Sequence, residues 1–192
     1  ATLSLTNSAC GGYDDVNKAS FGNTANSGNG GAIYNAGKIG ELNADGSIKT
    51  TVTGISGSAF ERNSAANGGA LYNTSSGTVT VTNNSSFKNN STSGSGGAIF
   101  NYTNAPTDPH GVISAIIGNF ENNSVTSLNA TAQAANGGAI SNNTNAHIGD
   151  ITGSFIGNKA LAVDDDAATT VIANASGGAI YNGASSTIGD IT

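Results

Sequence analysis

Two histidines, His110 and His147, are the residues of this 192-residue chain best suited to act as a general base near neutral pH. Such a base needs a partner within hydrogen-bond reach and a third group that orients it. His110 follows Asp108 and Pro109, and His147 precedes an Ile-Gly-Asp segment. Nothing in the sequence pairs either histidine with such a partner, so we predict that the chain has no catalytic residues and is not an enzyme.

Carboxylates offer a second chemistry, that of polysaccharide lyases and hydrolases, which place several acids on one face with a basic partner and often calcium. The 12 Asp and Glu residues are spread along the chain, and Arg62 is its only arginine. The run Asp164, Asp165 and Asp166 lacks the alternating ligands of a calcium loop and is expected to be a solvated acidic loop. We predict no metal and no cofactor, and a β-helical carbohydrate-active enzyme remains the enzymatic alternative.

The composition limits the partners. A net charge of −6, with 9% charged residues, argues against binding to nucleic acid and to an anionic membrane surface. No segment is long and apolar enough for this part of the chain to insert into a membrane. The single cysteine, Cys10, excludes an internal disulfide.

A short phrase that begins with two glycines recurs five times, at intervals of 28 to 41 residues, in segments 30–35, 68–73, 96–101, 137–142 and 177–182. A Phe-x-x-Asn phrase interleaves with it, in segments 60–63, 87–90, 120–123 and 155–158. Self-similarity at such a period indicates a solenoid. The added residues, which include 105–111 and 161–175, are expected in surface loops.

The pieces between the glycines favour short strands. Residues 78–82 alternate strictly between Thr and Val, and Gly, Asn, Ser and Thr dominate at the expense of helix formers. We predict an all-β fold, a parallel β-helix (β-solenoid) with about one three-strand coil per repeat. Two small coils in each of the 40-residue repeats are the alternative. The chain is expected to form a single solenoid over 1–192, with an irregular N-terminal coil at about 1–29 and repeats at about 30–192, as a fragment of a longer protein.

Alternation along the glycine phrase predicts which residues face inward. One position is always a large aliphatic residue and is expected to form a core ladder: Ile33, Leu71, Ile99, Ile140 and Ile180. The next position holds Ser141 in one repeat and is therefore placed on the surface, where its aromatic members form a candidate ligand surface: Tyr34, Tyr72, Phe100 and Tyr181. The Phe phrase is expected to supply a second core ladder.

Asparagine ends both phrases in every copy, at Asn35, Asn73, Asn101, Asn142 and Asn182 in the first and at Asn63, Asn90, Asn123 and Asn158 in the second. Asparagine tolerates the left-handed backbone of a sharp corner, and stacked asparagines can hydrogen-bond from coil to coil. We predict corner positions with amide ladders.

The alternating Gly-Gly-Ala-Ile/Leu and Phe-x-x-Asn phrases resemble the paired motifs of the polymorphic outer-membrane protein family of autotransporters. The resemblance implies a right-handed parallel β-helical passenger domain, displayed outside the cell on a bacterial surface and commonly used in adhesion.

We therefore predict an extracellular structural and adhesive passenger segment without catalysis. Its expected partners are proteins or glycans on a host or bacterial surface. A self-assembling extracellular filament unit, with end-to-end association of coils, is the second alternative.

Overall fold

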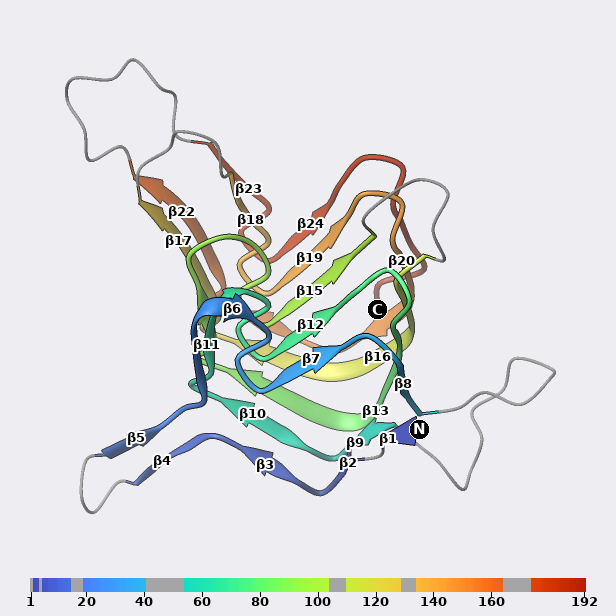
Figure 1. Ribbon diagram of the computed structural model, residues 1–192, viewed down its shortest axis with the longest axis horizontal. Helices are drawn as coiled ribbons and strands as arrows, with labels where there is room; N and C mark the ends of the chain where they lie inside the picture. Colours follow the sequence, from blue (N-terminus) through green and yellow to red (C-terminus); the bar gives the residue numbers. More distant parts are fainter. Residues whose placement is uncertain are drawn as a thin grey trace, which may run out of the picture.

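In the computed structural model, the described residues are 2–3, 5–14, 19–40, 54–103, 110–128, 134–163 and 174–192, and every regular element among them is a β-strand (Figure 1). Most strands lie in three parallel sheets, which we call sheets I, II and III. Two further pairs are short: the antiparallel hairpin of β4 (Gly12–Asp14) and β5 (Ala19–Phe21), and the parallel pair of β18 (Ala135–Asn136) and β23 (Ala175–Ser176).

Sheet I is the 11-stranded sheet and contains the longest strands. Its members are β1 (Thr2–Leu3), β2 (Leu5–Thr6), β3 (Ala9–Cys10), β8 (Lys38–Ile39), β9 (Ile55–Ser56), β10 (Ala59–Glu61), β13 (Thr78–Lys88), β16 (Val112–Glu121), β20 (His147–Thr152), β21 (Phe155–Ile156) and β25 (Thr187–Ile188).

Sheets II and III have five strands each. Sheet II comprises β6 (Thr24–Asn29), β11 (Ser64–Asn67), β14 (Ser91–Thr92), β17 (Ser124–Leu128) and β22 (Lys159–Val163). Sheet III comprises β7 (Ile33–Asn35), β12 (Leu71–Asn73), β15 (Ile99–Tyr102), β19 (Ile140–Asn143) and β24 (Ile180–Asn182).

Each repeat forms one coil that visits the three sheets in turn. From β12 in sheet III the chain enters β13 in sheet I, then β14 in sheet II, and returns to sheet III as β15. The 40-residue repeats follow the same course and add β18 or β23 between sheets II and III. The fold is therefore the predicted parallel β-helix, with one three-strand coil per repeat in the long copies as well as the short one.

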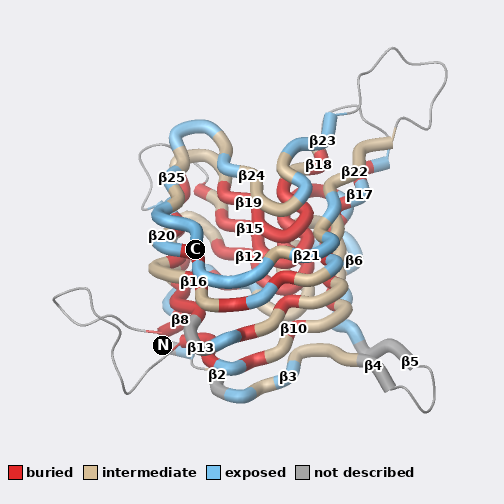
Figure 2. Tube along the Cα trace, turned by 180° about the vertical axis from the view of Figure 1, so that it is seen from behind, coloured by how far each residue is buried: buried red, intermediate tan, exposed pale blue. Residues whose placement is uncertain are grey.

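Ladders of apolar side chains fill the interior, and two of them come from the glycine and Phe phrases. Leu71, Ile99 and Ile140 lie in register on neighbouring strands of sheet III and are fully buried. In sheet I the rings of Phe60, Phe87, Phe120 and Phe155 stack at centroid distances of 5.0, 4.9 and 4.8 Å. Figure 2 shows the buried positions concentrated in the middle coils. The predicted inward phase of both phrases is confirmed, and Ile33 and Ile180 are the half-buried end members of the aliphatic ladder.

The two glycines of the phrase have different roles. The first adopts a left-handed backbone in all five copies, with φ between +61° and +70°. In the first four copies the second has no room for a side chain: a Cβ on Gly69 would collide with the carbonyl oxygen of Gly97 and the backbone nitrogen of Ser91 in the next coil. The pair therefore sets both the corner and the close approach of successive coils.

Both asparagine ladders are present. In the first, the Nδ2 atom of each asparagine donates to the Oδ1 atom of the next, at 2.7–2.9 Å, from Asn35 to Asn182. In the second, the same contact joins Asn63 to Asn90, Asn90 to Asn123 and Asn123 to Asn158, each at 3.0 Å.

The predicted left-handed backbone of these asparagines is wrong. None of the ladder asparagines has a positive φ, and the left-handed residue of the second phrase is the one directly before it: Arg62, Asn89, Asn122 or Gly157. The asparagine that follows directs its amide along the stack.

The assignment of 161–175 to a surface loop needs correction at both ends. Residues 161–163 belong to β22 and pair with Thr126, Ser127 and Leu128, and Ala175 belongs to β23. Asp164, Asp165 and Asp166 lie outside the described residues, as do 105–109 of the second loop.

Candidate ligand-binding groove

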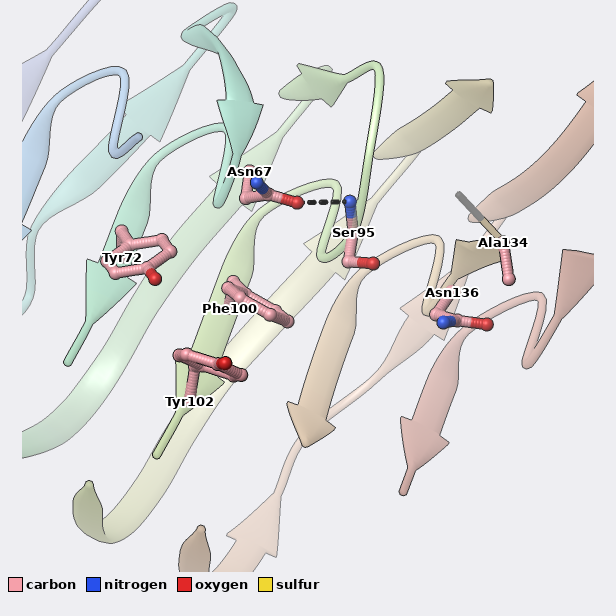
Figure 3. A pocket seen from close by; sticks show the side chains of 7 residues that line it. All are labelled: Asn67, Tyr72, Ser95, Phe100, Tyr102, Ala134 and Asn136. Carbon is pink, nitrogen blue, oxygen red and sulfur yellow. Dashed lines mark hydrogen bonds between the residues drawn. The ribbon is translucent and has the colours of Figure 1, made fainter. Parts of the chain in front are cut away.

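Sheet II and sheet III diverge on either side of β18 and β23 (Figure 1). A groove lies between them. It encloses about 380 Å³. Figure 3 shows its two walls: the sheet III side presents Tyr72, Phe100 and Tyr102, and the opposite side presents Asn67, Ser95, Ala134 and Asn136.

The aromatic row of sheet III does not form the evenly exposed stripe expected from the sequence. Tyr34 is 59% exposed, but Tyr72 and Phe100 are 8% and 6% exposed, and Tyr181 is half-buried. All four rings lie outside the aliphatic core on the outer side of sheet III, as alternation predicts. The expectation of exposure is therefore wrong for Tyr72 and Phe100, because the rings cover one another and line a groove.

The stacking of the row changes at Phe100. Tyr34 and Tyr72 are nearly parallel, with centroids 5.3 Å apart and an interplanar angle of 4°. Between Tyr72 and Phe100 the angle opens to 49° at the same centroid distance. Phe100 instead stacks at 15° and 5.5 Å on Tyr102, two residues further along its own strand.

Ser141 accounts for this change, because it lies in register with Phe100 on one side and with Tyr181 on the other. It offers Phe100 no ring to stack on, so Phe100 turns toward Tyr102. Ser141 is fully buried, and its Oγ atom has no hydrogen-bond partner among the described residues.

The polar wall comes from the residue directly before each glycine pair. Asn67 is fixed in place: its Nδ2 donates to Oδ1 of Asn29 at 3.1 Å, and its Oδ1 accepts from the backbone nitrogen of Ser95 at 2.9 Å. The backbones of Ser95 and Asn136, which belong to successive coils, form an isolated parallel β-bridge. Within the described part of the chain, no hydrogen bond occupies the side chain of Asn136.

The phenol of Tyr72 is neutral under physiological conditions. Burial raises the pKa of Tyr72 to about 12, and the neighbouring phenols of Tyr34 and Tyr102 add to the shift. Its hydroxyl can therefore both donate and accept a hydrogen bond at the groove.

The residues considered for catalysis do not come together in the described structure. His110 and His147 are exposed, and the Nδ1 atom of His147 contacts the Thr187 hydroxyl. Among the described residues no three His, Cys, Asp or Glu side chains are grouped to hold a metal.

Glu61 and Glu121 lie on either side of Lys88 in sheet I, and the Lys88 Nζ atom is 3.2 Å from Oε2 of Glu121. This row alternates in charge from coil to coil and is a surface feature of the stack.

Sequence reasoning placed part of the aromatic wall and missed the polar one. The signal for the missed residues was present: Asn29, Asn67, Ser95, Asn136 and Ser176 all precede a glycine pair, and this recurrence marks a structural row. Tyr102 could have been placed on the face of Phe100 from its spacing of two residues.

Comparison with known families agrees with this architecture. Residues 78–102 and 152–183 match the family model described as the Chlamydia polymorphic membrane protein repeat. No curated protein and no solved structure is significantly similar to the chain.

Each matched segment contains one Phe phrase and the glycine phrase that follows it, together with strands of all three sheets. The match supports the resemblance to polymorphic outer-membrane protein repeats that the sequence predicted. That family comprises bacterial surface proteins associated with the outer membrane and is not a family of enzymes. Among the described residues, no helix has the length and hydrophobicity needed to cross a membrane.

Proposed function

We propose that this segment is part of an adhesive passenger on the outside of a bacterial cell, and that it attaches to proteins or glycans of a host or neighbouring cell. The type of repeat supports display at the surface. The observation that carries the adhesive role is the outer side of sheet III, where an uncharged aromatic row borders a groove on a chain whose net charge is −6.

The β-helix suits this role. Register between coils is fixed by the apolar ladders and the two amide ladders, so outward side chains of successive coils are held in rows. A row of rings presents apolar area with polar edges and little loss of side-chain entropy on binding, which favours contact with sugars and with protein surfaces.

The test is attachment of beads coated with the purified chain to cultured epithelial cells. Tyr34→Ser removes the most exposed ring of the row, and Ile156→Ser, at a residue that is 61% exposed on sheet I, removes a similar apolar area elsewhere. We expect Tyr34→Ser to reduce attachment several-fold and Ile156→Ser to leave it unchanged.

Circular dichroism melting establishes that both variants are folded. Equal attachment of the folded Tyr34→Ser variant and the wild type would remove this face from the proposal. Failure of wild-type beads to attach would argue against the adhesive role of this segment altogether.

A further inference from the structure

We propose that the groove between sheets II and III is a binding site for a neutral oligosaccharide. The inference rests on the proposed adhesive function and narrows it to one ligand class and one location. It depends on Tyr102, Asn136 and Ser95, which lie outside the row predicted from the sequence.

The charge of the groove and of the chain around it favours an uncharged ligand. The described side chains that line the groove are aromatic, amide, hydroxyl or methyl groups, and no Asp, Glu, Lys, Arg or His is among them. The chain carries a net charge of −6, so an anionic glycan meets a repulsive field and finds no cation among the described lining residues. A volume of about 380 Å³ is within the range of sites that hold small ligands.

The two walls match the two sides of a sugar ring. Phe100 and Tyr102 form a stacked pair on the sheet III wall, and the C–H face of a pyranose can pack against such rings. Across the groove, the amide of Asn136 and the hydroxyl of Ser95 can exchange hydrogen bonds with sugar hydroxyl or acetamido groups. The neutral phenol of Tyr72 adds a third donor and acceptor.

The backbone of the polar wall disfavours a peptide ligand that adds as a strand. Such addition needs unpaired carbonyl and amide groups at a sheet edge. Here the carbonyl oxygen of Ser95 accepts from the backbone nitrogen of Gly68 at 3.0 Å, and that of Asn136 accepts from Gly96 at 2.9 Å. Side chains rather than backbone are therefore available for recognition.

Saturation-transfer NMR and isothermal titration calorimetry test the site with N,N′-diacetylchitobiose and N-acetyllactosamine as neutral probes and a sulfated heparin disaccharide as the anionic one. The expected result is saturable binding of at least one neutral probe, with the strongest transfer to C–H protons on one ring face, and no binding of the anionic probe. Tyr102→Ala and Asn136→Ala should each weaken that binding at least tenfold.

Two variants on sheet I serve as matched controls, Ile156→Ala for the apolar change and Asn119→Ala for the amide change. Both residues are exposed, and we expect neither change to alter binding. A folded wild-type protein that binds neither neutral probe would overturn the inference, as would equal losses in the groove and control variants.

The outcomes separate this inference from the proposed function. If beads attach to cells but neither neutral probe binds nor competes, adhesion stands and the saccharide site is refuted in favour of a protein ligand. If the probes bind but beads do not attach, the groove is a saccharide site and the adhesive role fails.

Discussion

Replacement of Asn101 by alanine tests whether buried amide ladders hold the coils together. Asn101 is fully buried and accepts from Nδ2 of Asn73 at 2.8 Å. Its own Nδ2 faces three acceptors: Oδ1 of Asn142 at 2.9 Å and the carbonyl oxygens of Gly111 and His147 at 3.1 and 3.0 Å. Removal breaks contacts to both neighbouring coils at once.

The expected cost follows from what is left without a partner. The Nδ2 atom of Asn73 loses its bond to Asn101 but keeps the bond to the carbonyl oxygen of Gly77 at 3.0 Å. The Oδ1 atom of Asn142 loses the Asn101 donor inside a buried site. A buried acceptor without a partner costs about 1–3 kcal/mol, and each further lost bond about 1 kcal/mol. We expect Asn101→Ala to lower the free energy of unfolding by about 3 kcal/mol.

Asn119→Ala is the matched control. Asn119 also bridges two coils, because its Oδ1 accepts from the nitrogen and the hydroxyl of Ser154 at 3.1 and 2.9 Å, but it is exposed and water can replace those bonds. Urea unfolding followed by far-ultraviolet circular dichroism should show a loss of about 0.5 kcal/mol or less for this control. Equal stability of Asn101→Ala and the wild type, or equal losses in both variants, would refute the role of burial in the ladder.

Four further perturbations probe other parts of the stack. Ile99→Asp buries an unpaired charge in the aliphatic ladder, and we expect circular dichroism to show no cooperative unfolding transition. Ser141→Ala removes a buried hydroxyl that has no partner among the described residues, and should leave the urea midpoint unchanged or raise stability by about 1 kcal/mol. Lys88→Glu places three acidic side chains in consecutive coils and should cost about 0.5–1 kcal/mol in low salt and less in 1 M salt (about 3 Å Debye length). Because the pKa of Tyr72 is higher in the folded protein than in the unfolded chain, the folded state retains the phenol proton to higher pH. The contribution of Tyr72 to the free energy of unfolding should be constant below about pH 10 and fall as the pH rises toward 12. Tyr72→Phe should remove that part of the decline in urea titrations.

The ladders could be predicted from the sequence because each is a single position repeated in register. A residue type that never changes between copies indicates one environment, and alternation along the strand says which side it faces. Leu71, Ile99 and Ile140 in sheet III and Phe60, Phe87 and Phe120 in sheet I follow that rule. In a solenoid, residues at the same position of successive repeats stack on one another, so the repeat in the sequence predicts which side chains meet in the core.

The backbone at the corners did not follow in the same way. An asparagine can serve a left-handed corner or an amide ladder, and the sequence does not separate the two uses. The structure does, since Arg62, Asn89 and Asn122 adopt the positive φ and leave the next residue free to bond along the stack.

The groove could not be predicted because it depends on two walls that come from different parts of the coil. The exposed fraction of Tyr72 depends on the packing of its ring against Tyr34 and Phe100 and on the position of sheet II relative to sheet III. Neither can be determined from the strand that carries Tyr72. Periodicity places a side chain on the outer side of a sheet, but only the path of the neighbouring chain decides whether that side is open.

Ser141 shows how a repeat fold can vary its outer surface without loss of its core. The inward position of sheet III is aliphatic in every coil, so a change there affects packing on both sides. The outward position tolerates Ser141 among aromatic neighbours, because the register is already fixed by Ile140 within and by the Asn142 amide beside it. The missing ring lets Phe100 tilt by 49° from Tyr72 and stack on Tyr102. The irregularity lies next to the groove, so the outer row is where coils of one architecture can differ in the surface that they present.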